Sequence, residues 1–213
     1  MKYYIIAGEA SGDLHGSNLL RELKLREDAA EFRCWGGDLM KAQGAVLVKH
    51  YRDLAFMGFT EVLLNLKTIL KNIDFCKNDI LHYAPDVLIL IDYPGFNLRI
   101  AEFAKENGIR VFYYISPQIW AWKQSRVHKI KRFVEHMFVI LPFEEEFYSR
   151  FDYHVDFVGH PLLDALTNST TETLPEEIKT DKPLIALLPG SRKQEVLQTL
   201  PQMLKMVKKF PVD

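Results

Sequence analysis

Short apolar runs that alternate with helical patterns constrain this chain more than any other feature of its sequence. Apolar runs of about five residues fit strands that are buried on both faces, and here a longer segment with helical spacing follows each run. Such repetition is typical of α/β proteins with a parallel sheet. The expected strand and helix pairs are 3–7 with 14–25, 87–91 with 98–106, and 111–115 with 127–133.

Further strands and one long helical segment complete the predicted domain. Strands are expected at 32–35, 45–48, 137–141, 155–158 and 184–188. The segment 61–82 is expected to form one helix or two. Its expected apolar face consists of Val62, Leu63, Leu66, Ile69, Leu70 and Ile73. We expect that face to pack on the sheet rather than to contact an acyl chain, because apolar stripes of helices normally face the core.

The composition changes between Thr167 and Pro183, where the chain is polar and contains proline. This change predicts three parts: an N-terminal Rossmann-like domain at 1–166, a linker at 167–183, and the first strand and helix of a second domain at 184–213. One strand and one helix cannot bury both faces of a sheet. The chain is therefore predicted to be a fragment of a two-domain protein whose second domain is truncated.

Charge and cysteine content exclude several classes of protein. The 213 residues carry a formal net charge of −1, from 27 basic and 28 acidic residues, so no global field indicates a nucleic-acid partner. The two cysteines, Cys34 and Cys76, form no motif and indicate a reducing compartment.

No apolar run approaches the roughly 20 residues of a membrane span, and no signal-peptide core precedes Gly8. We expect a cytoplasmic protein, at most peripheral to a membrane.

Asp92 is the strongest candidate for catalysis. The apolar run Val87–Ile91 stops at this carboxylate, and a Pro94-Gly95 turn follows. In open α/β sheets, ligands bind in the crevice beyond the carboxyl ends of the strands, so an acid placed there is a candidate base. Asp92 could instead bond its own turn. Asn97 is expected to cap the helix that follows.

The first strand runs into a small-residue loop, Gly8-Glu9-Ala10-Ser11-Gly12-Asp13. Two glycines ahead of a helix let backbone N–H groups approach a ligand closely. The loop is neither a Walker A motif nor Gly-x-Gly-x-x-Gly. A tight turn in which Ser11 or Asp13 caps the helix explains it equally well.

Aromatic and basic residues gather after another predicted strand. Ser116-Pro117-Gln118-Ile119-Trp120-Ala121-Trp122 precedes five cations, and aromatic walls beside cations suit a sugar or a lipid phosphate. A solvated surface is the alternative, because a helix would spread the cations over more than one face. The cations are Lys123, Arg126, Lys129, Lys131 and Arg132.

Two more turns are candidates for anion binding. In Pro189-Gly190-Ser191-Arg192, the start of a helix, a hydroxyl and a guanidinium could converge on a diphosphate, although a simple turn would look the same. His160 either lines the cleft or only ends the first domain. The sequence holds no Asp-x-Asp pair, His-Glu-x-x-His or Gly-x-Ser-x-Gly motif, so we expect no metal and no cofactor.

These motifs together resemble the lipid-A-disaccharide synthases. They occur in the family's order across nearly the whole chain, and six in order make coincidence an unlikely explanation. The matching segments are Gly8–Asp13, Ile91–Asn97, Ser116–Trp122 with Arg126 and Lys129, Leu141–Glu144, Gly159-His160, and Leu187–Arg192.

The resemblance implies a B-type glycosyltransferase with two Rossmann-like domains and no cofactor. Members of the family transfer 2,3-diacylglucosamine from its UDP derivative to 2,3-diacylglucosamine 1-phosphate with inversion, which gives the β-1′,6 disaccharide of lipid A and UDP. The first domain presents the lipid acceptor, and the C-terminal domain holds the nucleotide sugar. A peripheral position on the inner face of the cytoplasmic membrane is implied. This chain departs from the pattern because it ends soon after the second domain begins, so we expect the fragment alone to be inactive.

With the substrates that the resemblance implies, Asp92 at its strand end is our candidate base for the acceptor 6-hydroxyl. Two alternatives remain open: a UDP-sugar epimerase of the same fold, and a noncatalytic lipid- or sugar-binding module. The sequence leaves the oligomeric state open. Acceptor contacts are expected at Gly8, Glu9, Ser11, Gly12, Asp13, Asn97, Ser116, Trp120, Trp122, Lys123 and Arg126, and donor phosphate contacts at His160, Gly190, Ser191 and Arg192.

Overall fold

A computed structural model describes residues 1–54, 66–168, 184–190 and 193–207 of the chain. The chain divides into two compact units, Met1–Asn168 and Ser169–Asp213. The first unit contains the sheet and the hydrophobic core of the described residues.

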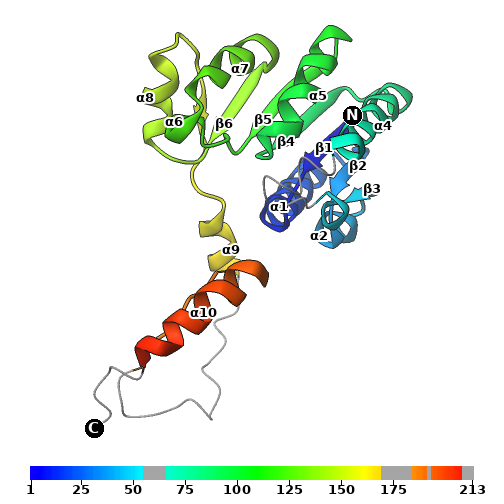
Figure 1. Cartoon of the computed structure of the whole chain (residues 1–213). Helices are drawn as coiled ribbons and strands as arrows, with labels where there is room; N and C mark the ends of the chain where they lie inside the picture. The colour runs from blue at the N-terminus through cyan, green and yellow to red at the C-terminus, as the bar shows by residue number, and fades with distance from the viewer. Residues whose placement is uncertain (55–65, 169–183, 191–192, 208–213) are drawn as a thin grey trace. The chain divides into compact units, whose positions relative to one another are not determined.

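The first unit is built on a parallel sheet of seven strands, in the order β3-β2-β1-β4-β5-β6-β7 (Figure 1). Every described strand pair is parallel. The predicted Rossmann-like α/β fold is therefore confirmed. The strands are β1 (Lys2–Ala7), β2 (Glu31–Gly36), β3 (Val46–His50), β4 (Val87–Ile91), β5 (Arg110–Tyr114), β6 (His136–Val139) and β7 (Asp156–Phe157).

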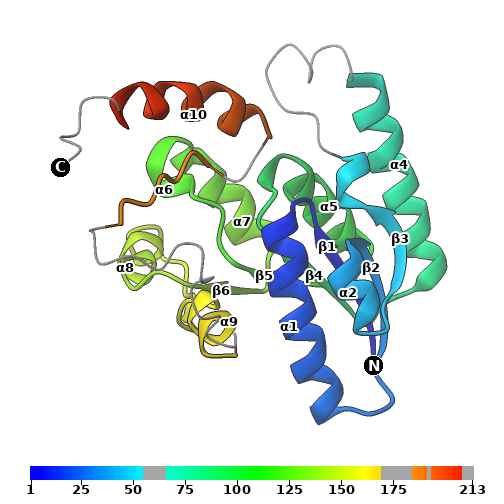
Figure 2. The same ribbon diagram turned by 90° about the horizontal axis from the view of Figure 1, so that it is seen from below.

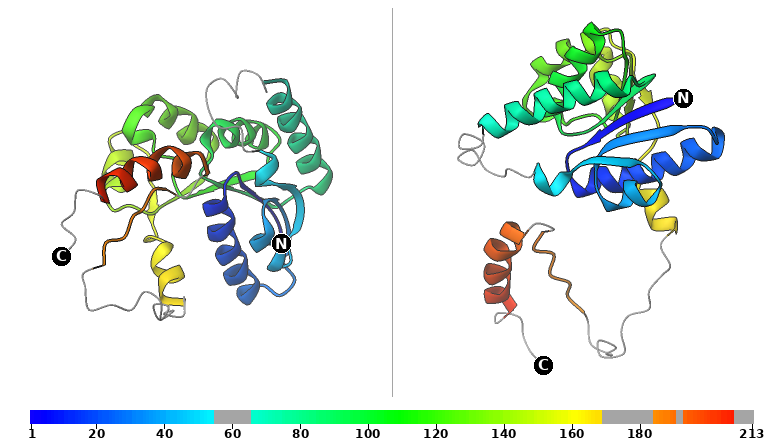
Figure 3. Two further views of the ribbon diagram at one scale, coloured as in Figure 1. Left: turned by 60° about the horizontal axis from the view of Figure 1, so that its bottom comes forward. Right: turned by 90° about the vertical axis from the view of Figure 1, so that its right-hand side faces the viewer.

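Helices cover both faces of the sheet. Helices α1 and α2 lie on one face, and α4, α5 and α7 lie on the other (Figures 2 and 3). None of the described helices is long and apolar enough to cross a membrane. The helices of this unit are α1 (Ala10–Arg26), α2 (Asp38–Ala42), α4 (Leu66–Tyr83), α5 (Pro94–Glu106), α6 (Ile119–Trp122), α7 (Val127–Phe133), α8 (Phe143–Ser149) and α9 (Leu162–Asn168), with 3-10 turns at Tyr51–Asp53 and Gln124–Arg126.

The apolar patterns fold as the sequence predicts. β4 and α7 have the predicted bounds, and the other strands of the first unit differ by one or two residues at their ends. Side chains alternate along the buried strands, so that Leu88 belongs to the core on one face and Ile89 to the core on the other. In α4, Ile73 is buried and Ile69 packs on the same core, as predicted for this helix. The prediction is wrong for Leu70, which is 48% exposed. Val62 and Leu63 lie outside the described residues.

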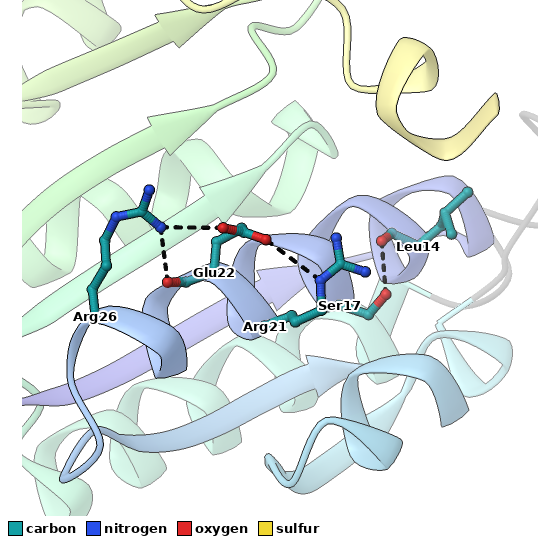
Figure 4. A network of polar contacts seen from close by, with 5 residues as sticks. All are labelled: Leu14, Ser17, Arg21, Glu22 and Arg26. Carbon is teal, nitrogen blue, oxygen red and sulfur yellow. Dashed lines mark hydrogen bonds and ion pairs between the residues drawn. The ribbon is translucent and has the colours of Figure 1, made fainter. Parts of the chain in front are cut away.

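Helix α1 approaches the sheet closely because two of its positions are glycine. A Cβ at Gly12 would lie 3.0 Å from the Cβ of Ala7, and one at Gly16 would lie 2.8 Å from Sδ of Met40. Figure 4 shows polar contacts along the same helix. Arg26 donates to the carbonyl of Glu22 at 3.0 Å and to its carboxylate at 3.2 Å. The buried positions of α1 are small or polar apart from one leucine: Gly12, Asp13, His15, Gly16, Ser17 and Leu20.

The second unit contains α10 (Lys193–Val207) and the described segment 184–190. The strand predicted at Leu184–Leu188 is absent: the segment has no regular secondary structure, and Leu188 is 81% exposed. A strand needs a neighbour to pair its backbone groups, and none of the described residues supplies one here.

Candidate active site

The site lies where the strand order of the sheet reverses. From β1 the chain builds outward through β2 and β3, and then returns to place β4 on the other side of β1. Ligands of open α/β sheets bind at such a switch point, beyond the carboxyl ends of the strands. Ala7 at the end of β1 pairs with Ile91 at the end of β4, and Ile91 also pairs with Tyr114 of β5. The residues after these three strands therefore share one edge.

Asp92 stands at this edge, directly after β4. Solvent reaches its side chain, but the surrounding protein atoms partly desolvate the carboxyl, and this raises its pKa. The negative charge of Glu9, at the end of the neighbouring strand, raises the pKa further, while a hydrogen bond from the backbone of Tyr93 opposes the rise. A carboxylate with a raised pKa at a switch point has the properties of a general base.

The loop after β1 is buried at one residue and exposed at others. Gly8 is buried beneath the ring of Tyr93, and a Cβ there would lie 2.4 Å from Cγ of that ring. Glu9 precedes the first residue of α1, and both Glu9 and Ser11 are exposed. Neither Ser11 nor Asp13 caps α1, since both lie within the helix. Among the predicted acceptor contacts of this loop, Glu9 and Ser11 are the ones open to solvent.

Asp13 has a structural role, which corrects its prediction as an acceptor contact. Its side chain is 2% exposed. Its carboxylate accepts backbone N–H groups from Gly37 at 2.8 Å, Leu39 at 3.1 Å and Met40 at 3.0 Å. These are donors at the start of α2, where no intrahelical partner exists. Asp13 therefore caps α2 from the neighbouring helix and has no free oxygen to offer to a ligand.

Asn97 is also structural, which corrects both predictions made for it. It is fully buried inside α5, where Tyr93 rather than Asn97 is the N-cap. Its side-chain amide donates to the carbonyls of Ile91 at 3.2 Å and Asp92 at 2.8 Å. Asn97 thus reaches back from the helix to hold the end of β4.

A buried polar cluster supports the segment after β5. Ser116 is 5% exposed, and its hydroxyl lies 2.8 Å from that of Tyr148; its contact with an acceptor stays a prediction. Glu144, 1% exposed, accepts the N–H groups of Ile140 at 3.2 Å and Leu141 at 3.0 Å. Burial raises the pKa of Glu144, although these bonds and the polar groups of Ser116 and Trp120 oppose the rise. Glu144 belongs to a predicted motif, but no role is predicted for it, because its burial leaves no local signal in the sequence.

Of the two tryptophans that follow β5, Trp122 is the exposed one. It is 68% exposed, with Nζ of Lys123 at 5.1 Å and the guanidinium of Arg126 at 5.4 Å from its ring centroid. Both cations are within the range of a cation–π contact. Trp120 is half-buried and packs edge-on against Phe143 at 5.0 Å. The structure therefore brings Trp122, Lys123 and Arg126 together at one surface, which we call the Trp122 patch.

His160 lies on a separate apolar cavity. This cavity, of about 630 Å³, lies against the sheet face beside α1. Its lining includes Val87, Ile89, Phe112 and His160, and Asp92 is not part of it. Burial lowers the pKa of His15, and the charge of His160 lowers it further. His160 thus contributes to a cavity of the first unit.

Of the predicted donor contacts in the second unit, only Gly190 is among the described residues. Its φ of 114° is a conformation that favours glycine, and a Cβ there would lie 2.6 Å from the Glu195 carboxylate. Ser191 and Arg192 lie outside the described residues. Within the described parts of the chain, no cluster of His, Cys, Asp and Glu has the geometry to hold a metal ion.

The fold and the switch-point site define a Rossmann-like α/β protein of the kind found in enzymes of UDP-sugars. The UDP-N-acetylglucosamine 2-epimerase of Neisseria meningitidis, solved with its UDP-sugar, superposes with a TM-score of 0.57 at 11% identity, over 78% of this chain and 48% of that one. Another UDP-N-acetylglucosamine 2-epimerase gives 0.60 at 14% identity, over 82% and 53%. At such identities the likeness establishes the fold alone.

Sequence relatives identify the family. The profile of the lipid-A-disaccharide synthetase family matches residues 3–211. The chain is 49% identical to the lipid-A-disaccharide synthase of Syntrophus aciditrophicus, over 94% of this chain and 53% of that protein. It is 45% identical to that of Trichlorobacter lovleyi, over the same shares. The chain belongs to the lipid-A-disaccharide synthetase family, and it spans about half the length of the curated relatives that it matches.

Proposed function

We propose that this chain supplies the acceptor half of a lipid-A-disaccharide synthase, a glycosyltransferase. In this proposal, 1–166 binds 2,3-diacylglucosamine 1-phosphate, 167–183 is a linker, and 184–213 begins the domain for UDP-2,3-diacylglucosamine. The observation that carries the proposal is the carboxylate of Asp92 at the switch point of a chain that belongs to this family. His160, Gly190, Ser191 and Arg192 are the proposed contacts of the donor phosphates.

The proposed reaction is one displacement with inversion. The 6-hydroxyl of the acceptor attacks the anomeric carbon of the donor, and the bond from that carbon to the UDP oxygen breaks. A sugar hydroxyl ionises too weakly at neutral pH to attack unaided, so the Asp92 carboxylate accepts its proton as the new bond forms. The transition state is expected to resemble an oxocarbenium ion, as in glycoside hydrolysis.

The Trp122 patch and Glu9 and Ser11 are the surfaces proposed for the acceptor. Their exposure and their position after β1 and β5, the two strands that flank β4, support this assignment. Because both substrates carry acyl chains, we also propose that the protein works at the inner face of the cytoplasmic membrane, where the Trp122 patch meets anionic headgroups.

The variant Asp92→Asn tests the proposed base. Turnover is measured with this chain joined to the part of the Syntrophus aciditrophicus relative beyond the matched region, because the chain spans 53% of that protein. We expect Asp92→Asn to lose 100-fold or more in kcat, on the order of the share that general-base catalysis supplies. Calorimetric titration with the acceptor should show retained binding.

The pH profile provides a second check of the same role. Asp92 acts as a base only when ionised, and its pKa is raised, so kcat/KM of the parent protein should fall as pH falls through that raised pKa. Glu9→Gln removes the nearby charge and should move this fall in kcat/KM toward lower pH. Near-normal turnover by Asp92→Asn would remove Asp92 from the role.

A further inference from the structure

The turn after β4 has a strained backbone. Asp92 and Tyr93 have φ values of 43° and 46°, so two consecutive residues with side chains adopt the left-handed conformation. This conformation costs about 1–2 kcal/mol per residue relative to ordinary backbone. It persists only where surrounding contacts fix it, and such strain is concentrated at functional sites.

Two buried donors fix the carbonyl of Asp92. The hydroxyl of Tyr113, from β5, donates to this oxygen through a short hydrogen bond. Nδ2 of Asn97, from α5, donates to the same oxygen at 2.8 Å. Both donors are fully buried, and they come from two different elements. Together they occupy both lone pairs of one carbonyl and so fix the plane of the peptide that follows Asp92.

The next residue is fixed as well. The ring of Tyr93 lies directly over Gly8, where no Cβ would fit, and stacks on Phe96 with centroids 5.6 Å apart. Contacts from the loop after β1, from β5 and from α5 therefore converge on a two-residue turn. Because Cα of Asp92 lies between the fixed peptide and the end of β4, these contacts also set the direction of its carboxyl.

Stability alone does not explain this arrangement. Asp92 is an exposed residue, yet both side-chain donors to its carbonyl come from the core, and Oδ1 of Asn97 is left buried without a hydrogen-bond partner. An unpaired buried oxygen lowers stability. Burial raises the pKa of Tyr113 well above its usual range, so the phenol stays a donor at every working pH.

We propose that Tyr113 is a positioning residue that acts through Asp92, with Asn97 as the second donor. Tyr113 holds the strained turn so that the Asp92 carboxyl points to the reacting hydroxyl, without touching the substrate itself. The proposal rests on the proposed function, since Asp92 is the group that Tyr113 positions.

The variant Tyr113→Phe removes the hydroxyl and keeps the ring that fills the core. Tyr153→Phe is the matched control, because the Tyr153 hydroxyl also donates to a backbone carbonyl, that of Val134 at 3.1 Å, before the start of β6. The Asp92 carboxyl carbon is followed by ¹³C NMR titration of this 213-residue chain, with Asp92→Asn assigning its signal. Turnover is measured with the joined protein described above.

We expect Tyr113→Phe to move the Asp92 titration to lower pH, because the released turn exposes the carboxyl to more water. It should also lower kcat at least tenfold while KM for the acceptor changes less than threefold. Tyr153→Phe should change neither quantity. Asn97→Leu, which has a similar volume and removes the second donor, should move the Asp92 titration in the same direction.

A merely structural role would show as equal losses of thermal stability in the two Phe variants, with the Asp92 titration and kcat unchanged; that result would overturn the proposal. Failure of the proposed function looks different, because Asp92→Asn would then keep its turnover. In that case a shifted Asp92 titration in Tyr113→Phe would still support the positioning of the carboxyl, and an unshifted one would refute it.

Discussion

At the scale of single residues, three carboxylates of the first unit have separate tasks. Asp13 accepts backbone N–H groups on both of its oxygens, buried Glu144 accepts two on Oε2, and Asp92 remains open to solvent. A carboxylate whose lone pairs are occupied by N–H donors has little capacity left to accept a proton from a substrate. Position in the sequence alone does not separate these cases, because each acid follows a strand or begins a helix.

Substitution of Asp13 should therefore affect folding. Asp13→Ala leaves the N–H groups of Gly37, Leu39 and Met40 without their acceptor, and we expect a loss of about 2–3 kcal/mol in the free energy of unfolding. Urea denaturation of this chain measures it. Asp38→Ala is the matched control: Asp38 lies in the first turn of the same helix but is 69% exposed, so its loss should stay below about 1 kcal/mol. Equal losses in the two variants would argue against capping of α2 by Asp13.

At the scale of elements, one polar network fastens α4 to the sheet. Asp79 of α4 accepts two hydrogen bonds from Arg33 of β2, at 2.8 and 2.6 Å, and one from the Tyr4 hydroxyl of β1 at 2.6 Å. Trp35 donates to the Tyr4 oxygen at 2.9 Å. Burial by itself raises the pKa of Asp79, but the bonds from Arg33 and Tyr4 outweigh it, so the pKa is lowered.

This network predicts how stability depends on pH. Because the pKa of Asp79 is lower in the folded than in the unfolded protein, its contribution is complete above the unfolded pKa, about 4, and is lost as pH falls through the folded pKa. Asp79→Asn should lower the free energy of unfolding by about 1–3 kcal/mol at neutral pH. It should also flatten the acid limb of the plot of this free energy against pH. Urea unfolding across the acid range checks both. Asp74→Asn, an exposed position on the same helix, should leave the limb intact, and an unchanged limb in Asp79→Asn would refute the assignment.

The elements themselves follow from local patterns where tertiary partners are present. β4 forms where five apolar residues predict it because β1 and β5 flank it. Residues 184–188 have a similar pattern, but no described strand pairs with them, and they form none. The roles of Asp13, Asn97 and Tyr113 depend on contacts between segments 20 or more residues apart or across a turn, which periodicity and motif spacing do not encode.

At the scale of the whole molecule, charge is nearly balanced, so attraction to a surface depends on local patches. The formal net charge is −1. Of the five cations between Lys123 and Arg132, Lys129 is paired with Glu102 at 3.2 Å and Lys131 donates to the carbonyl of Phe151 at 2.8 Å. The role predicted for the whole run stays a prediction, and Lys123 and Arg126 beside Trp122 are the cations that we propose for contact with headgroups.

Vesicle co-sedimentation tests this assignment. The chain should bind vesicles that contain anionic lipid. The pair Lys123→Gln with Arg126→Gln should weaken binding about 30-fold, since each of the two cations near the surface contributes about 1 kcal/mol. The pair Lys129→Gln with Lys131→Gln changes the net charge equally and should have a smaller effect. Added salt should weaken the parent chain more than the first pair, because screening acts on exposed charges. Equal effects of the two pairs would show that net charge rather than the Trp122 patch determines binding, and no binding at all would remove the membrane from the proposed function.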